Sequence, residues 1–296
     1  MDYRPYFPRF KYKKFHTLRP ALELTTMVGC PLMCSFCPQK LLKSAYGASS
    51  KYLSIDDLRL FLKKVPRNLE FQFSGMAEPW ANSACTDMLE LVLERGHHVS
   101  IYTTLYGMKE QDASKVRTLI SKFQNRVNKF VIHLPDKNGN MKGFKLTEEW
   151  LFAFRLLSNI EGFKKVEVMT MDSAGVPHPD IQDLVNATPS FSGHTRAGSL
   201  DTEQVKGQRV SKTPHNEFSL TCRTTPFFDR NVLLPNGDVV LCCMDYGLKH
   251  IVGNLHEKSY NEIMVGHQVK QIDAINRTPR FSEDSICKKC ENVRRV

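Results

Sequence analysis

The sequence lacks any long apolar run. No segment is both long and uncharged enough to cross a bilayer, and the first twenty residues contain no continuous apolar stretch that could act as a signal peptide. Internal repeats and low-complexity segments are also absent. These absences argue against a membrane, fibrous or disordered protein, and cytoplasmic localisation without a membrane partner is therefore the expectation.

A strong net charge is lacking as well. The formal charge of +10 is moderate for 296 residues, and Lys and Arg are spread along the chain, with concentrations at 9–14 and near the C-terminus. Such a charge is compatible with an anionic partner and equally with an ordinary solvated surface. No added nucleic-acid-binding module is recognisable, so a nucleic acid is not the expected partner. With 41% hydrophobic residues the chain can bury a full core, which suits one large domain or one with an appendage.

Cysteines are plentiful by contrast. The chain has nine, an odd number, and in a reducing compartment clusters of thiols indicate metal binding more than disulfides. Cys30, Cys34 and Cys37 follow a β-rich apolar segment at 22–28. Three thiolates can hold three corners of a four-iron four-sulfur cluster and leave the fourth iron open to a non-protein ligand. Three unrelated loop cysteines, or part of a zinc site, are the alternatives.

Short β-rich runs alternate with helical patterns over the first two thirds of the chain. The β-rich runs lie at 22–28, 69–75, 98–105, 127–134 and 164–171. Helices are expected at 54–65, 83–95, 112–124 and 147–158, the first with Ser54 as N-cap and Asp57 completing a capping box. This alternation predicts an α/β fold with βα units around a parallel sheet.

The pattern changes at about residue 200. A polar connector is expected at 201–217, and 227–243 is typical of a β-hairpin with Asn236 and Gly237 at its turn. The remaining C-terminal unit is small for an independent core. We therefore expect two domains, at 1–200 and 201–296.

The cysteine triplet would follow the first strand, where loops at the carboxyl ends of parallel strands build active sites. Its Cys-x-x-x-Cys-x-x-Cys spacing, with Phe36 before the last cysteine, resembles the signature of the radical S-adenosylmethionine superfamily. The segment at 74–79, SGMAEP, is similar to the Gly-Gly-Glu-Pro motif of that family, although Ala77 replaces the usual second glycine. The segment at 102–105, YTTL, is similar to the ribose-side segment of the family.

The resemblance implies a mechanism and a set of cofactor-binding residues. The open iron would bind the amino and carboxylate groups of S-adenosylmethionine, and an electron from a donor such as flavodoxin or ferredoxin would cleave it. The resulting 5′-deoxyadenosyl radical abstracts a hydrogen atom. The matching cofactor-binding residues are Phe36, Gly75, Glu78, Thr103 and Thr104. Gly75 permits a close backbone approach and Glu78 supplies a carboxylate for an ammonium group, whereas on their own these residues are equally a turn with an exposed acid.

The C-terminal cysteines extend the resemblance. Cys222, Cys242, Cys287 and Cys290 resemble the ligands of the twitch domain, a shortened SPASM domain that carries an auxiliary four-iron four-sulfur cluster. Four ligands close such a cluster, which then conducts electrons and holds a small domain together. A four-cysteine zinc site is the alternative. The implied fold is a partial parallel (βα)6 barrel over 15–200, then the twitch domain and a short helix or tail.

Two cysteines remain. Cys85 follows a helical apolar rhythm, which indicates a packed core thiol. Cys243 directly follows Cys242, and adjacent side chains of an extended strand point to opposite faces. If Cys242 faces the auxiliary cluster, Cys243 faces the barrel and the substrate; a buried passive thiol is the alternative.

Small twitch-containing enzymes of aminoglycoside biosynthesis, the neomycin epimerase and the 2-deoxy-scyllo-inosamine dehydrogenase, are the group that the whole chain resembles. The matching segments are HTRAG at 194–198 and VGNLHEKSYNEI at 252–263. On this resemblance Arg196 faces the active site, where its guanidinium can position a hydroxyl or carboxylate. A surface ion-pair arginine is the alternative.

Three reactions fit the resemblance, each beginning with hydrogen abstraction. An epimerase acting on a sugar or aminoglycoside-like molecule is the leading hypothesis, with Cys243 returning hydrogen to the opposite face. A dehydrogenase would instead oxidise a secondary alcohol to a ketone through the auxiliary cluster. A peptide-modifying enzyme is less favoured, because the 29 residues before Cys30 are too few for a leader-peptide-binding domain.

Overall fold

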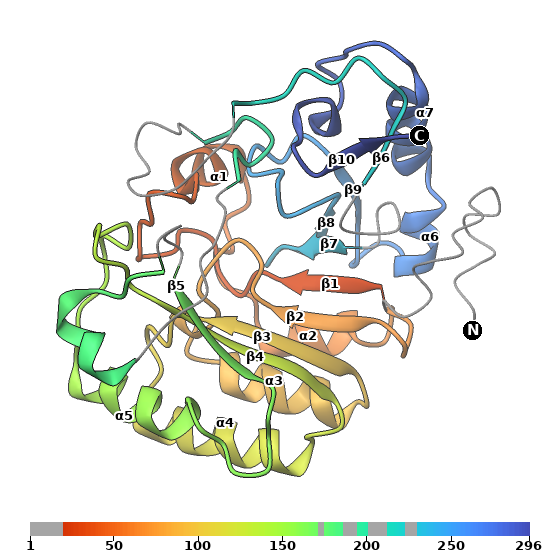
Figure 1. Cartoon of the computed structure of the whole chain (residues 1–296). Helices are drawn as coiled ribbons and strands as arrows, with labels where there is room; N and C mark the ends of the chain where they lie inside the picture. The colour runs from red at the N-terminus through yellow and green to blue at the C-terminus, as the bar shows by residue number, and fades with distance from the viewer. Residues whose placement is uncertain (1–19, 171–174, 186–193, 201–211, 223–229) are drawn as a thin grey trace.

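A computed structural model describes residues 20–170, 175–185, 194–200, 212–222 and 230–296 of the chain (Figure 1). The polar connector expected at 201–217 and the first residues of the expected hairpin lie partly outside these described residues. So does the expected domain boundary, which stays a prediction.

A single large sheet organises the described residues. Its strands, in chain order, are β1 (Ala21–Leu24), β2 (Glu70–Phe73), β3 (His98–Thr103), β4 (Val127–Leu134), β5 (Val166–Thr170), β7 (Arg230–Leu233), β8 (Asp238–Val240) and β9 (Ile251–Asn254). Their spatial order is β5-β4-β3-β2-β1-β7-β8-β9. Strands β1 to β5 and β7 run parallel, while β8 and β9 are antiparallel additions. The predicted α/β fold with a mostly parallel sheet is confirmed.

The sixth parallel strand comes from an unexpected part of the chain. Six βα units were expected over 15–200, but the described residues of that range contain five parallel strands. Strand β7 pairs with β1 in parallel, from Ala21 opposite Arg230 to Leu24 opposite Leu233. The C-terminal part of the chain therefore extends the main sheet, and the two expected domains share it.

Helices cover one face of the parallel strands (Figure 1). They are α2 (Ile55–Phe61), α3 (Cys85–Glu94), α4 (Glu110–Lys122) and α5 (Glu148–Leu157). The Ser54 side chain accepts a hydrogen bond from the Asp57 backbone N–H over 3.0 Å, so the N-cap of α2 is confirmed. Helix α4 begins two residues before the expected position, and α1 (Gln39–Ala45), directly after the cysteine triplet, was not expected.

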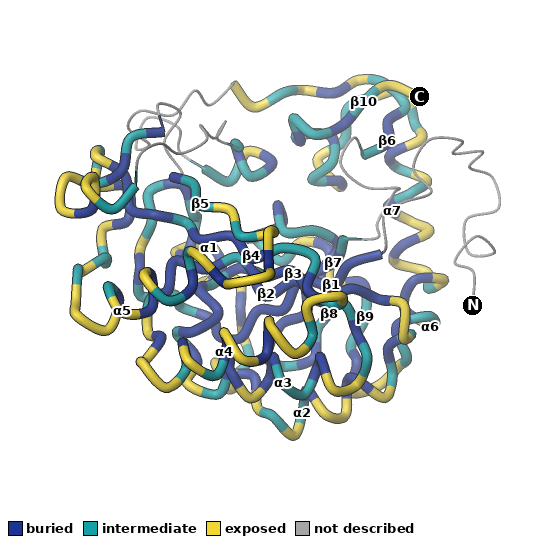
Figure 2. The backbone as a smooth tube through the Cα atoms, turned by 60° about the horizontal axis from the view of Figure 1, so that its bottom comes forward, coloured by how far each residue is buried: buried dark blue, intermediate teal, exposed yellow. Residues whose placement is uncertain are grey.

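The apolar core lies between this face of the sheet and the helices. The strands are buried while the outer turns of the helices are exposed (Figure 2). Phe71, Phe73 and Phe130 are fully buried there, and Cys85 lies in the same core, as its helical rhythm predicted. The opposite side of β1 and β2 carries polar residues, among them Glu23 and Gln72.

The C-terminal unit is built around a second, two-stranded sheet. It pairs β6 (Leu220–Cys222) with β10 (Val293–Arg295) in antiparallel fashion and places Cys222 opposite Val293. Its helices are α6 (Tyr260–Met264) and α7 (His267–Arg277), and the short 3₁₀ helices of the chain are η2 (Pro79–Ala81), η3 (Pro179–Leu184) and η5 (Ile286–Lys289). The β7–β8 hairpin turns at Gly237, which has a φ of 85°, as the Asn-Gly pair predicted.

No helix in the described part of the chain is long and apolar enough to span a membrane.

Candidate active site

A cavity of about 430 Å³ lies between the carboxyl ends of the parallel strands and the C-terminal unit. All fourteen predicted site residues line it: Cys30, Cys34, Phe36, Cys37, Gly75, Glu78, Thr103, Thr104, Arg196, Cys222, Cys242, Cys243, Cys287 and Cys290. The fold thus brings together residues that are up to 260 positions apart in the sequence. Their individual roles stay predictions.

The cysteine triplet occupies the loop after β1. A segment after β4 supports this loop: the Ser35 N–H donates to the Asn140 carbonyl oxygen and the Gly143 N–H to the Leu32 carbonyl oxygen, each over 2.8 Å. A Cβ atom at Gly143 would lie 2.3 Å from the Pro31 carbonyl oxygen, so only glycine allows this contact. No pattern in the sequence predicted this support.

The thiols of the triplet suit a positively charged iron core. Burial raises the pKa of Cys34 well above its ordinary value, and the neighbouring Cys37 and Cys30 raise it further. The three sulfurs are thus close enough to affect one another, and as thiolates they need a cation nearby. Hydrogen bonds reach the sulfurs as well, from the Glu78 N–H to Cys30 over 3.5 Å and from the Gln39 amide to Cys37 over 3.3 Å. The donor set therefore fits an iron–sulfur cluster.

Glu78 is tied into the protein rather than left exposed. Its Oε1 accepts from Thr103 Oγ1 over 2.6 Å, and its Oε2 accepts from the N–H and the hydroxyl of Thr104 over 2.7 and 2.8 Å. The Trp80 N–H adds a contact of 3.3 Å to Oε1. The carboxylate therefore fastens the loop after β2 to the end of β3, a positioning role beside the predicted contact with an ammonium group.

Gly75 allows a close approach, as predicted, and the structure shows what it approaches. Its φ is 52°, and a Cβ atom there would lie 2.5 Å from Thr25 Oγ1 and 2.7 Å from the Leu24 carbonyl oxygen. The Met76 N–H donates to Thr25 Oγ1 over 3.0 Å. The glycine thus lets the loop after β2 lie directly against the end of β1.

The four C-terminal cysteines converge from three segments. Cys222 ends β6, Cys242 follows β8, and Cys287 and Cys290 lie within and just after η5. Burial raises the pKa of Cys287 and of Cys290, and the neighbouring Cys222 raises both further. The Asn292 N–H donates to the Cys290 sulfur over 3.4 Å. In the described ranges no group of three or more His, Cys, Asp or Glu side chains is arranged to hold a single metal ion.

Cys243 reaches the cavity by a route other than strand alternation. Strand β8 ends at Val240, so Cys242 and Cys243 lie in the turn that follows and the premise of an extended strand is wrong. The two side chains nevertheless pack against different neighbours. Cys242 packs with Leu220 and Cys290, whereas Cys243 packs with the apolar group that includes Tyr246.

Two ionisable groups, Arg196 and Glu23, interact with the Cys243 thiol. A hydrogen bond with Cys242 and burial raise the pKa of Cys243 well above its ordinary value, while Arg196 and Glu23 lower it.

Arg196 lies in a left-handed stretch of backbone. Arg196, Ala197 and Gly198 have φ values of 50°, 51° and 80°, an arrangement that non-glycine residues rarely adopt. Glu291 holds the start of the stretch by accepting from the N–H and hydroxyl of Thr195 over 2.6 and 2.8 Å. The Arg196 guanidinium faces the cavity, 5.8 Å from the Tyr246 ring. The structure therefore contradicts a surface ion-pair role.

Sequence reasoning missed several residues of the cavity wall. They are Glu23, Tyr102, His133, Arg230 and Tyr246. Glu23 had a recognisable signal, because an acid between two leucines is unusual in a buried parallel strand. Arg230 and Tyr246 had none, since only the pairing of β7 with β1 and the turn after β8 bring them to the cavity.

Comparisons with known proteins agree with this arrangement. Residues 222–291 match the family model described as SPASM, iron-sulfur cluster-binding domain. A crystal structure of BtrN in complex with AdoMet and 2-DOIA superposes with a TM-score of 0.59 at 16% identity, covering 94% of each chain. BtrN in an open conformation gives 0.54 at 13% identity, again over 94% of each chain. The chain therefore has the BtrN fold.

A weaker likeness links the chain to anSMEcpe with bound AdoMet and Cp18Cys peptide. Its TM-score is 0.49 at 16% identity, over 92% of this chain and 86% of the other. A search of curated protein sequences found no match.

Proposed function

We propose that this chain, a radical S-adenosylmethionine protein with a C-terminal iron–sulfur domain of the SPASM family, is an epimerase. Its substrate would be a sugar or aminoglycoside-like small molecule, and the inverted centre a carbinol carbon. One observation carries the proposal: eight of the nine cysteines line one cavity, and seven of them are the predicted ligands of the two clusters. Cys243 is the eighth, a thiol in the cavity without a place in either set.

The two ligand sets have different tasks in this proposal. Cys30, Cys34 and Cys37 would hold one four-iron four-sulfur cluster, and the four C-terminal cysteines would hold the auxiliary one. When bound, the first cluster and S-adenosylmethionine supply a 5′-deoxyadenosyl radical, which takes the substrate hydrogen. Phe36, Gly75 and the Glu78–Thr103–Thr104 hydrogen-bond network would shape the cofactor side of the cavity.

Cys243 would complete the inversion. Its S–H bond breaks homolytically and a C–H bond forms on the opposite face of the substrate radical, which leaves a thiyl radical on Cys243. One electron and one proton then restore the thiol, the electron from an external reductant such as a flavodoxin or ferredoxin. S-adenosylmethionine is consumed as a co-substrate, because its adenosyl group keeps the abstracted hydrogen as 5′-deoxyadenosine.

A dehydrogenase is the second candidate, and the shared cavity favours it too. The auxiliary ligand Cys242 and the substrate-facing Arg196 line the same space, so an electron could pass from a substrate radical to an auxiliary cluster. The substrate would lose two hydrogen atoms and become a ketone. Cys243 would have no role in that reaction.

Solvent deuterium distinguishes the two reactions. Anaerobically reconstituted protein is incubated with S-adenosylmethionine, reductant and candidate glycosides in deuterium oxide, and 5′-deoxyadenosine and product mass are measured. Because a thiol proton exchanges with solvent, an epimer should carry one deuterium at the inverted carbon. The Cys243→Ala and Cys243→Ser variants should still form 5′-deoxyadenosine but no epimer, since neither side chain has a weak S–H bond.

The opposite pattern would reject the epimerase. A product lighter by two hydrogen atoms, without solvent deuterium and formed equally well by Cys243→Ser, would identify the dehydrogenase. No 5′-deoxyadenosine with any glycoside, but its formation with a peptide, would favour a peptide-modifying enzyme.

A further inference from the structure

Two guanidinium groups face the cavity from elements outside both cysteine sets. Arg196 belongs to the left-handed stretch at 196–198, and Arg230 is the first residue of β7. Both are part-buried and line the cavity. Among the described residues no carboxylate oxygen lies within the 4.0 Å of an ion pair from either group. The Arg230 Nε atom is buried and has no hydrogen-bond partner in the described residues.

Glu23 is the carboxyl group that interacts with both arginines, and it has hydrogen-bond partners of its own. Glu23 accepts from the Ser74 hydroxyl over 3.4 Å and shares a hydrogen bond with the Cys243 thiol. Burial, followed by Cys243, raises the pKa of Glu23 well above its ordinary value, although Arg230 opposes this shift. Glu23 is thus one carboxyl group beside two guanidinium groups, and it lies within ion-pair distance of neither.

The other carboxylate that affects Arg230 is Glu70, which already accepts from the Ser100 hydroxyl over 2.6 Å and from the Asn128 amide over 2.7 Å. Burial, with a smaller contribution from Arg196, lowers the pKa of His133 to about 4, so this imidazole is neutral at physiological pH. Its ring lies 6.2 Å from that of Tyr102. The groups that affect Arg230 are Glu23, Cys243, Tyr102 and Glu70, none of which belongs to a ligand set. No cysteine of the two predicted ligand sets therefore compensates the positive charge of Arg230.

Arg196 donates to the Met244 sulfur over 3.9 Å and lies over the Tyr246 ring, and neither contact neutralises its charge. A part-buried guanidinium without an anionic partner is costly, and its planar fork of donors matches carboxylate and phosphate oxygens. We propose that Arg230 and Arg196 form an oxyanion subsite, so that the substrate is an acidic sugar carrying a carboxylate or phosphate group. This inference rests on the proposed function for the reaction itself and narrows its substrate class. A protonated amino sugar would be repelled by the same two groups.

Equilibrium binding tests the subsite without requiring catalysis. Reconstituted holoenzyme with S-adenosylmethionine, but no reductant, is titrated calorimetrically with four classes of hexose in the gluco, galacto and manno configurations. The classes are hexuronates, hexose 6-phosphates, neutral methyl glycosides and protonated 2-amino sugars. We expect an acidic member to bind about tenfold or more tightly than its neutral and amino counterparts, and the uronate and phosphate arms decide which oxyanion is preferred.

Variants test whether Arg230 causes the tighter binding of acidic sugars. Arg230→Gln should reduce the affinity for the acidic sugar about tenfold or more while leaving the neutral counterpart unchanged, and Arg230→Lys should retain part of the preference. The matched control is Arg59→Gln on exposed α2, which should change neither affinity. Iron content and circular dichroism verify that each variant is folded.

Three results would overturn the subsite: tighter binding of a neutral or amino sugar than of its acidic counterpart, an acidic preference that survives in Arg230→Gln, or no binding of any acidic sugar at millimolar concentration. The proposed function fails separately. Binding of an acidic sugar without 5′-deoxyadenosine after reductant is added would reject the radical reaction and keep the subsite. Turnover of neutral sugars, without tighter binding of acidic ones, would keep the radical reaction and reject the subsite.

Discussion

A single carboxylate, Glu78, connects the loop after β2 to the end of β3 in the cavity wall. Its two oxygens accept four hydrogen bonds from Trp80, Thr103 and Thr104, and it is 5% exposed. Burial raises its pKa, and the hydrogen bonds from both threonines oppose that shift. A buried carboxylate that keeps its partners fixes the geometry of both loops.

Replacing this acid by an amide tests its positioning role. In Glu78→Gln one carboxylate oxygen becomes an NH₂ donor, which would face a donor of Thr103 or Thr104. We expect a loss of about 1–3 kcal/mol in the free energy of unfolding and weaker S-adenosylmethionine binding, measured by denaturant titration and equilibrium dialysis. Thr104→Val is the matched variant, because it removes one hydroxyl donor and should cost less. Unchanged stability and affinity in Glu78→Gln would contradict the role.

The grouping of Cys30, Cys34 and Cys37 in one loop could be predicted because their spacing is local, whereas Cys222, Cys242 and Cys287 are 20 and 45 positions apart and were grouped by resemblance. The role of all seven as cluster ligands stays a prediction. The Glu23, Arg196 and Arg230 cluster could be predicted only in part. An acid inside β1 signals a polar lining, and resemblance placed Arg196 at the site, but Arg230 reaches Glu23 through a long-range strand pairing. No local pattern encodes the partner of a strand that is separated from it by about two hundred residues.

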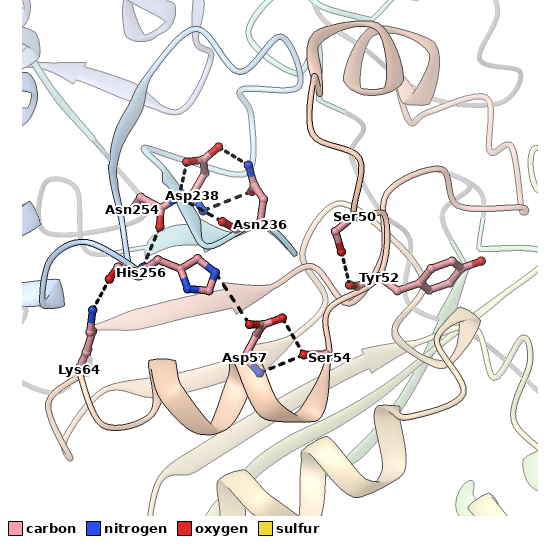
Figure 3. Close-up of polar contacts among 9 residues, drawn as sticks. All are labelled: Ser50, Tyr52, Ser54, Asp57, Lys64, Asn236, Asp238, Asn254 and His256. Atoms are coloured by element: carbon pink, nitrogen blue, oxygen red, sulfur yellow. Dashed lines mark hydrogen bonds and ion pairs between the residues drawn. The ribbon is translucent and has the colours of Figure 1, made fainter.

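At the scale of elements, a group of polar residues, here called the polar joint, connects the β7–β8 hairpin to α2 (Figure 3). It consists of Asn236, Asp238, Asn254, His256 and Asp57. The Asn254 side-chain amide donates to Asp238 Oδ1 over 2.9 Å and to the Asn236 carbonyl oxygen over 3.1 Å. His256 follows, with its N–H donating to Asn254 Oδ1 over 2.7 Å and its ring 3.9 Å from Asp57 Oδ1. This joint lies at the opposite end of β8 from the turn that carries Cys242 and Cys243.

Gly237 is the tightest point of the joint. A Cβ atom there would lie 2.7 Å from His256 Cδ2, 2.8 Å from Asn254 Oδ1 and 3.1 Å from Phe61 Cζ, and its φ of 85° already disfavours a side chain. Gly237→Ala should therefore lower the free energy of unfolding by about 2–4 kcal/mol, from backbone strain plus the steric displacement. Denaturant titration measures the loss.

A second glycine separates the cost of backbone strain from the cost of the steric displacement. Gly96 has a φ of 90° but no atom within 4 Å of its ideal Cβ position, so Gly96→Ala reports strain alone. We expect Gly237→Ala to cost more than this control and to reduce the iron content of the C-terminal set. Equal losses in the two variants would show that the joint is not tightly packed.

The sequence predicted the position of elements that have capping or turn residues at their ends. It did not predict elements that lack such residues. Ser54 and Asp57 mark the start of α2, and Asn236 with Gly237 marks the hairpin turn, because caps and turns depend on a few adjacent residues. Helix α1 has a proline as its N-cap residue and no side-chain cap, so nothing in its sequence marked its start.

At the scale of the whole molecule, the C-terminal unit has two kinds of attachment. Strands β7 to β9 belong to the main sheet, whereas β6 and β10 form a separate two-stranded sheet. Among the described residues, Lys288 helps to hold the second part, since its ammonium group donates to the Phe218 and Thr278 carbonyl oxygens over 2.8 and 2.7 Å. The proposed auxiliary cluster would provide the other link, because Cys242 follows the main sheet while Cys222 ends β6.

Removing two ligands should therefore loosen one part of the chain and spare the other. Reconstituted wild-type protein should contain about eight irons, and the Cys287→Ala/Cys290→Ala variant about four, because only the auxiliary cluster is lost. Ligation contributes to folding, so we expect earlier melting and faster proteolysis within 212–222 and 286–296, with 20–170 still protected. Replacing Cys30, Cys34 and Cys37 should instead abolish S-adenosylmethionine cleavage while the C-terminal segments stay protected.

The metal found in the wild-type protein distinguishes the auxiliary cluster from a zinc site. With an auxiliary cluster, elemental analysis gives iron and sulfide in equal amounts, and the double variant loses both. If zinc accompanied about four irons and the double variant lost only zinc, the C-terminal set would be a structural zinc site. Electron transfer from a substrate radical through Cys242 would then be impossible, because zinc has no redox chemistry, and the dehydrogenase alternative would fail with it.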